Sequence, residues 1–231
     1  MKTNKNVARS ILISLFTSLM IGCGNDDDPY RVVLGTNNFL VKATGNLQYQ
    51  LPFVVQVTNI DGTPASHAPV TFTIKALDYR KGYYIKTDTS SPPDSIEDAW
   101  RASITATCNI EDSNSNGTMD AGEDNNGNGI LDPTNPATIS AHSSLTPTID
   151  NTNGKLITDE NGYGYFVMSY PPSEAYWVRI QMTAIADGNS EPEVYETVLP
   201  ALESDLSNIN ITPPGGVYGK YGLASVCTDP N

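Results

Sequence analysis

The stretch from residue 111 to residue 133, EDSNSNGTMDAGEDNNGNGILDP, consists largely of oxygen-bearing side chains and glycine. Carboxylate, amide and backbone carbonyl oxygens are the ligands that Ca²⁺ takes in proteins. Oxygen-bearing side chains recur at alternate positions from Asp112, a glycine at the sixth position permits a sharp turn, and a glutamate stands at the twelfth. The spacing therefore predicts a first calcium site with the ligands Asp112, Asn114, Asn116, the Thr118 carbonyl, Asp120 and Glu123.

A second register begins at once with Asp124, twelve residues after the first. Its twelfth position is Asn135, which cannot chelate with two oxygens as a glutamate does, so we expect a weaker site. We also expect Ile130 and Leu131 to pack against the folded body. The cofactor prediction is thus one to two Ca²⁺ ions, and the alternative is a solvated, disordered linker. The ligands of the second site are Asp124, Asn126, Asn128, the Ile130 carbonyl and Asp132.

The first register matches the loop pattern of EF-hands, D-x-[DN]-x-[DN]-G-x5-E. Its flanks, RASITATC and DPTNPATI, are not amphipathic helices, so an EF-hand pair is not expected. The tandem arrangement resembles the calcium loops of thrombospondin type 3 repeats, which coil around their ions without flanking helices. Because asparagine ligands lower the negative charge of a site, we expect weak binding, near roughly 10⁻⁴–10⁻³ M.

The segments around these loops alternate with a period of two residues, which is typical of half-buried strands. In APVTFTIK (68–75), for example, Val70, Phe72 and Ile74 alternate with polar residues. No long amphipathic helix is evident, so about seven to nine short strands predict an all-β sandwich, with residues 88–99 and 109–135 as loop insertions. The other expected strands are FVVQVTN (53–59), GYYIKTD (82–88), WRASITATC (100–108), GYGYFVMSY (162–170), YWVRIQMTAIA (176–186) and EVYETVL (193–199).

Three segments carry a family resemblance, namely NIDGTPASHAPVTFTI, GKLITDENGYGYFVMSYP and YWVRIQMTAIADG. In this order they resemble the group 1 bacterial Ig-like domain of invasin- and intimin-type proteins, over about residues 48–200. The resemblance implies an Ig-like β-sandwich that serves as a stalk or adhesion module and has no catalytic residues. This chain departs from the family in carrying one copy with large insertions, where tandem copies are common.

The N-terminus has the layout of an export signal. Cationic residues precede an apolar run, residues 11–21, which is too short to span a bilayer as a helix. The run ends in LMIGC, which resembles the lipobox of bacterial lipoproteins and implies cleavage before an acylated Cys23. We therefore expect a signal peptide over residues 1–22, and a lipid anchor in the bacterial outer membrane on its periplasmic or surface face. The alternative is an ordinary signal peptide.

The remaining chain divides into a tether at 23–37, a sandwich at 38–203 that contains the calcium insertion, and a tail at 204–231 packed on it. Cys108 and Cys227 are the two cysteines left once Cys23 is acylated. Exported proteins meet an oxidising environment, so we expect these two to form a disulfide rather than remain buried thiols. Such a bridge would stabilise the fold by roughly 4–5 kcal/mol in the chain-entropy model.

Charge and motifs narrow the function. Without the signal, 10 Lys and Arg face 26 Asp and Glu, a formal net charge of −16 that disfavours nucleic acid as a partner. His67 and His142 are the only histidines, and no nucleophile elbow, zinc motif or phosphate loop is present. We therefore expect no enzyme, and a Ser-His-Asp hydrolase is a remote alternative.

Aromatic residues suggest the remaining choice of partner. Exposed rings could stack on sugars, although pairs across strands or within the core are the favoured explanation of strand aromatics. The predicted function is a non-catalytic cell-envelope lipoprotein with a structural or adhesive role and a protein or glycan partner. The alternative is a calcium-dependent carbohydrate-binding lipoprotein. The rings considered are Tyr83, Tyr84, Trp100, Tyr163, Tyr165, Tyr170, Tyr176 and Trp177.

Overall fold

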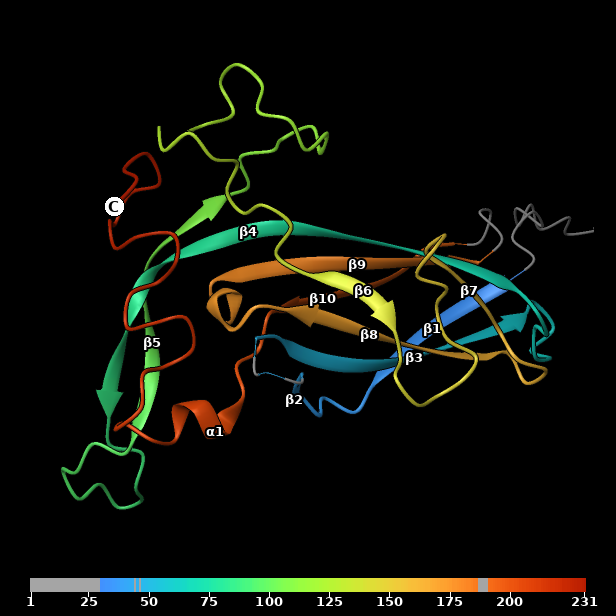
Figure 1. The fold of residues 1–231 in the computed structure, drawn as a ribbon, viewed down its shortest axis with the longest axis horizontal. Coiled ribbons are helices and arrows are strands. Elements are labelled where there is room, and N and C mark those ends of the chain that lie inside the picture. The colour runs from blue at the N-terminus through green and yellow to red at the C-terminus, as the bar shows by residue number, and fades with distance from the viewer. Residues whose placement is uncertain (1–29, 44, 46, 187–190) are drawn as a thin grey trace, which may run out of the picture.

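Two antiparallel five-stranded sheets pack face to face, which confirms the predicted all-β sandwich (Figure 1). The computed structural model describes residues 30–43, 45, 47–186 and 191–231, so the predicted signal peptide and Cys23 lie outside the described residues. The first sheet has the order β1 (Tyr30–Thr36), β3 (Tyr49–Asn59), β8 (Tyr163–Tyr170) and β6 (Thr138–Ala141), with β2 (Val41–Lys42) beside β3. The second has the order β10 (Glu193–Val198), β9 (Val178–Ala186), β4 (Pro69–Thr87) and β5 (Ala99–Asn109), with β7 (Lys155–Ile157) beside β4.

The period-two pattern predicted the central strands correctly. Every second residue of β9, from Val178 to Ala186, is buried, and β3 shows the same alternation. Rings from both sheets meet between the layers: Phe72 and Phe166 lie 4.4 Å apart between centroids, and Phe166 stacks on Phe53 at 5.2 Å. The core therefore forms from the inward faces of the two sheets, as alternation requires.

The segments 68–75 and 82–88, expected to be two strands, belong to the single 19-residue strand β4. A bulge between Lys81 and Gly82 shifts its register against β5. A Cβ added to Gly82 would lie 2.1 Å from the Ser103 carbonyl oxygen, so only glycine fits there. The part of β4 after Asp78 pairs with β5 and forms a hairpin at one end of the molecule, which we name the β4–β5 arm (residues 78–109; Figure 1).

Part of the predicted tether is a strand instead. Tyr30–Thr36 forms β1 and pairs along its whole length with β3, so the folded body begins before residue 38. Buried Val32 lies opposite buried Val57, and this apolar contact explains why the segment joins the sheet. The helices are short, η1 (Pro172–Glu174) and α1 (Glu203–Leu206), and no helix in the described part of the chain is long and apolar enough to cross a membrane.

The tail packs on the β4–β5 arm. A disulfide joins Cys108 of β5 to Cys227, with Cα atoms 5.5 Å apart, as predicted. The fully buried Lys81 ammonium donates to the backbone carbonyl of Asp229, and the Tyr84 amide donates to the Val217 carbonyl at 2.7 Å. Covalent and backbone contacts thus hold the tail beside the arm, where the C-terminus lies in Figure 1.

Candidate metal centre

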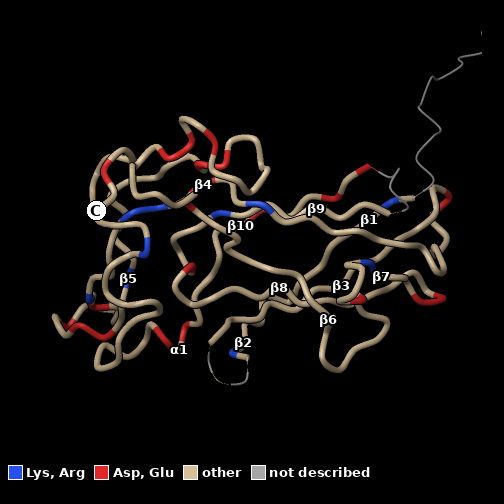
Figure 2. The backbone as a smooth tube through the Cα atoms, turned by 45° about the horizontal axis from the view of Figure 1, so that its top comes forward, with Lys and Arg blue, Asp and Glu red and all other residues tan. Residues whose placement is uncertain are grey.

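The segment between β5 and β6 forms two successive loops, which we name the first loop (residues 112–123) and the second loop (residues 124–135). They lie over one edge of the molecule, next to the β4–β5 arm (Figure 1). Acidic residues gather on this part of the backbone (Figure 2). The fold thus places both predicted calcium sequences together on one connection.

In the first loop, backbone amides converge on the predicted ligands. The Asp112 carboxylate accepts hydrogen bonds from the amides of Asn116 and Gly117, at 3.0 and 2.9 Å. Gly117 has φ of 70°, the left-handed conformation that glycine adopts without strain. The side-chain amides of Asn114 and Asn116 both donate to Asp120 Oδ2, at 2.8 and 2.9 Å. Side chains from four alternating positions therefore converge.

Glu123 closes the first loop. Its Oε1 accepts the backbone amide of Ser113, and its Oε2 accepts the backbone amide of Asp120, both at 3.0 Å. Glu123 is only 6% exposed, although its neighbours in the loop are solvated. Both oxygens of the carboxylate at the twelfth position thus bind backbone amides of the loop.

The second loop repeats this frame twelve residues later. The Asp124 carboxylate accepts the amides of Asn128 and Gly129, both at 3.0 Å. The side-chain amides of Asn126 and Asn128 donate to Asp132 Oδ2 at 3.0 and 2.7 Å. The amides of Thr118 and Ile130, the seventh residues of the two loops, each donate to the asparagine two residues earlier at 2.7 Å. The two loops therefore share one backbone design.

A residue outside the predicted ligand set closes the second loop. Glu111 accepts the amide of Asp132 at 3.0 Å and the amide of Asn126 at 3.2 Å. The bond that the Asp132 amide donates to Glu111 is the counterpart of the bond that the Asp120 amide donates to Glu123. Asn135, the residue in the twelfth position, is exposed. The inference of a weaker second site from Asn135 therefore overlooked Glu111, and a carboxylate directly before Asp112 is the signal that could have identified it.

The two loops differ in how far their residues are buried. Glu111, Asn126 and Asp132 are 1%, 4% and 8% exposed, whereas Asn114, Asn116 and Asp120 are solvent-exposed. Burial raises the pKa of Glu111 above its ordinary value, and the nearby charges of Asp132 and Asp124 raise it further, against the backbone hydrogen bonds that lower it.

Tyr79 of β4 links the second loop to the core. Burial, followed by the charge of Glu111, raises the pKa of Tyr79 to about 12, while a hydrogen bond with the Asn126 side chain lowers it. Leu131 is half-buried, but Ile130 is 55% exposed, so the expectation that Ile130 packs on the body is wrong. Polar residues and one tyrosine, rather than Ile130, attach the loop.

The donor set suits a hard cation. No three carboxylate, histidine or cysteine side chains gather as a metal cluster within the described part of the chain. Each loop would instead combine carboxylates with amide and backbone carbonyl oxygens, which Ca²⁺ accepts. The side-chain nitrogens of the four asparagines are directed at Asp120 and Asp132, and their oxygens accept backbone amides two residues further on. Ligation of an ion by these oxygens would have to share or replace those backbone hydrogen bonds.

The other candidate residues lie elsewhere. His67 is exposed, and its Nδ1 is 2.6 Å from Ser66 Oγ. His142 follows β6, and its Nδ1 accepts the backbone amides of Ser144 and Leu145 at 3.2 and 3.0 Å. These contacts with a neighbouring hydroxyl and with backbone amides are local ones, and neither histidine belongs to the two loops.

Most of the aromatic residues considered for sugar stacking belong to the core. Tyr84, Tyr170 and Trp177 are at most 2% exposed, and Trp100 is 8% exposed. The Tyr84 ring meets the Trp177 ring edge-on at 5.4 Å. These four buried rings are therefore not available to stack on a sugar. Of the eight rings, Tyr83 is exposed, at 37%.

No family model matches the chain, and a search of curated proteins found no significant match. The Ig-like and calcium-loop resemblances therefore stay predictions.

Proposed function

We propose that this chain is a non-catalytic lipoprotein of the bacterial cell envelope, in which Ca²⁺ stabilises an Ig-like β-sandwich that has a structural or adhesive role. One observation carries the calcium part of the proposal: the hydrogen-bond frame of the first loop recurs twelve residues later in the second loop. A solvated linker gives no reason for such a repeat, whereas two ions of the same kind would need it.

Each loop would hold one ion. In the first loop, Asp112, Asn114, Asn116, the Thr118 carbonyl, Asp120 and Glu123 would supply the oxygens. In the second, Asp124, Asn126, Asn128, the Ile130 carbonyl and Asp132 would do so, with Glu111 in the place of a twelfth-position glutamate. A bound ion would neutralise the clustered carboxylates and cross-link the loop. The residues of the chain itself set the loop shape through the amides that the aspartates accept.

The structural or adhesive role rests on the predicted lipid anchor at Cys23, the sandwich fold and the resemblance to Ig-like stalk modules. The partner would be a protein or glycan of the envelope. Burial of Tyr84, Tyr170 and Trp177 weakens the original argument for a calcium-dependent carbohydrate-binding lipoprotein, because those rings cannot stack on a sugar.

Calorimetric titration of the purified protein with Ca²⁺, together with thermal melts, tests the calcium proposal. We expect saturable binding and a rise in melting temperature with Ca²⁺. The Asp112→Ala/Glu123→Ala variant should lose the first ion and the Asp124→Ala variant the second. Glu160→Gln, which removes an exposed acid outside the loops, is the matched control and should bind like the parent. Absence of heat and of stabilisation at millimolar Ca²⁺ would return both loops to solvated connections.

A further inference from the structure

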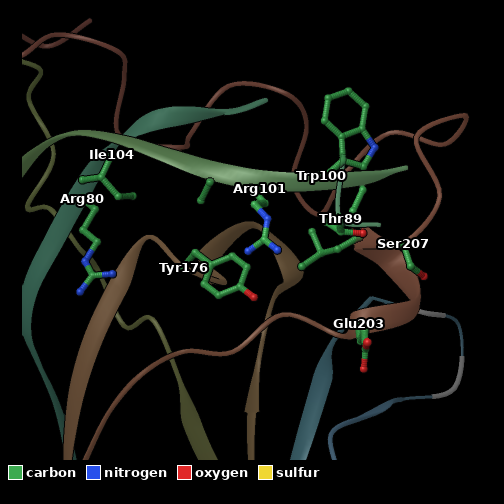
Figure 3. Close-up of a pocket in the computed structure, with 11 residues that line it drawn as sticks. Arg80, Thr89, Trp100, Arg101, Ile104, Tyr176, Glu203 and Ser207 are labelled. Atoms are coloured by element: carbon green, nitrogen blue, oxygen red, sulfur yellow. The ribbon is translucent and has the colours of Figure 1, made fainter. Parts of the chain in front are cut away.

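A cleft of about 540 Å³ lies between the β4–β5 arm and α1. Arg80 of β4, Arg101 of β5 and Tyr176 line it, together with Glu203 and Ser207 from α1 and the residue after it. Figure 3 shows the side chains of Arg80 and Arg101 on either side of the Tyr176 ring. Its volume is within the range of about 300–1,000 Å³ that small-ligand sites occupy.

The two arginines have no carboxylate partner among the described residues. The ion pairs there involve Lys42, Arg179 and Lys220 instead. The chain carries a formal charge of −13, so acids are abundant, yet these two guanidinium groups face a cleft unpaired. Arginine presents a planar fork of donors that matches a carboxylate or phosphate, so the pair makes the cleft a candidate anion site.

Tyr176 provides an independent observation at the same place. Its φ is +68°, a left-handed conformation that is rare and unfavourable for a tyrosine. The surrounding backbone holds it there: its amide donates to the Leu199 carbonyl at 2.8 Å, and the Arg80 amide donates to the Trp177 carbonyl at 2.6 Å. Strained residues gather at ligand sites, and this strain places a half-buried ring between two cations.

The remaining lining defines the ligand further. Two arginines and Glu203 leave a net charge of +1, which suits a monoanion better than a phosphate with two charges. Ser207 adds a hydroxyl group and Glu203 an acceptor, both suited to ligand hydroxyls. The Thr89 hydroxyl donates to Asp98 Oδ1 at 2.5 Å, so it offers a ligand only its acceptor lone pairs. The Tyr176 ring supplies an aromatic surface for an apolar face of the ligand.

We propose that this cleft binds a carboxylate-bearing sugar unit of an acidic polysaccharide. Arg80 and Arg101 hold the carboxylate, Tyr176 contacts the sugar ring, and Thr89, Ser207 and Glu203 face its hydroxyls. A peptide carboxylate would satisfy the arginines, but it would leave the Ser207 hydroxyl and the Glu203 carboxylate without partners. The assignment depends neither on calcium nor on the lipid anchor, because none of the six residues belongs to either loop.

Calorimetric titration with digalacturonic acid tests the assignment. We expect saturable binding, with at least a 10-fold loss of affinity in Arg101→Gln and in Arg80→Gln. Lys155→Gln removes an exposed cation on β7 and should leave the affinity unchanged. Arg101 is itself exposed, so its variant should fold as the parent does.

Two further ligands and one further variant test whether the cleft recognises both the carboxylate and the sugar ring. The methyl diester of digalacturonic acid keeps the rings and removes both charges, so we expect it not to bind. N-acetyl-dialanine carries a carboxylate without a sugar and should bind at least 10-fold more weakly. Tyr176→Leu should weaken digalacturonate binding several-fold. Three results would each overturn the assignment. They are no digalacturonate binding at about 10 mM, equal binding of the diester or the peptide, and unchanged affinity in both arginine variants.

Discussion

The first and second loops have the same hydrogen-bond frame but different surroundings. The first loop extends into solvent and is closed from within by Glu123, whereas the second lies against Tyr79 and is closed by Glu111 from the end of β5. Local sequence fixes the frame, because aspartate, asparagine and glycine recur at the same spacing. Tertiary structure decides which carboxylate completes it, and that carboxylate need not belong to the loop.

The difference implies different roles. Under the proposed function, an ion in the first loop would have little effect on the sandwich, since the proposed ligands are mostly exposed. The second holds a buried glutamate whose charge is costly without a partner, so its ion should couple to the stability of the fold. We therefore expect the second site to dominate calcium-dependent stability.

The largest effect should follow removal of the disulfide that fixes the end of β5. Cys108→Ser/Cys227→Ser should lower the free energy of unfolding by roughly 4–5 kcal/mol, because a constraint on the unfolded chain is lost. Urea denaturation with and without reductant measures this. Calcium affinity should fall more in the second loop than in the first, since Glu111 follows Cys108 closely. Equal losses in both loops would contradict the assigned difference.

The next largest effect should come from Glu111→Gln. The variant keeps the shape and loses the charge, so the second site should bind Ca²⁺ at least about 10-fold more weakly while the first site is unchanged. Asn135→Ala is the matched control and should leave both affinities unchanged. Calorimetric titration of each variant with Ca²⁺ measures the affinities of the two sites. If Asn135→Ala weakened binding and Glu111→Gln did not, the twelfth-position interpretation would stand after all.

Tyr79→Phe should produce a smaller change. Loss of the hydroxyl removes the contact with Asn126 and should cost about 1 kcal/mol of unfolding free energy. The melting temperature in Ca²⁺ measures the change, and affinity of the first loop serves as the internal control. An equal change in both loops would argue that the tyrosine does not distinguish them.

The smallest expected effect is on the connection at residues 88–98. The Asp88 side chain holds this loop together by hydrogen bonds. The Asp88 carboxylate accepts the amides of Asp94 and Ser95, at 2.9 and 2.7 Å, and the Ser90 hydroxyl, followed by backbone amides, holds the pKa of Asp88 below its ordinary value. A lowered pKa stabilises the fold above the unfolded-state value, near 4, and this stability is lost as the pH falls through the folded-state pKa.

Chelation of Ca²⁺ at constant pH should therefore leave the protection of the Ser95 amide against exchange unchanged. Acid below about pH 4 should lower its protection factor, the ratio of the intrinsic to the observed exchange rate. Asp88→Asn should remove that acid dependence and leave calcium binding intact. Hydrogen exchange followed by NMR is the measurement. Faster exchange at Ser95 on chelation alone would mean that the three loops act as one unit.

The central strands and the position of the two loops could be predicted from the sequence. Alternation predicted the central strands because β3 and β9 bury every second residue, and the spacing of aspartate and asparagine predicted both loops. The bulge at Gly82 was missed because a glycine flanked by two strand-like segments resembles a turn, and β1 was missed because its partner, β3, is not adjacent in sequence to any part of the tether.

Glu111 was missed for the same physical reason. A local pattern assigns ligands by position, but Glu111 precedes the first loop and contacts the second. It lies two residues after the end of β5, the strand that the disulfide joins to the tail. The cleft beside α1 likewise joins Arg80 of β4, Arg101 of β5 and Tyr176 from the connection between η1 and β9. Sequence patterns thus predict groups that are near neighbours and miss those that only folding brings together.

The most direct test measures how many Ca²⁺ ions the protein binds. Native mass spectrometry of the purified protein in millimolar Ca²⁺ should show two bound ions, with one left in Asp112→Ala and one left in Asp124→Ala. Glu111→Gln should lose the second ion first as the Ca²⁺ concentration is lowered. No specifically bound ion in the parent protein, or two ions retained in Asp124→Ala, would contradict the central claim that each loop is a calcium site.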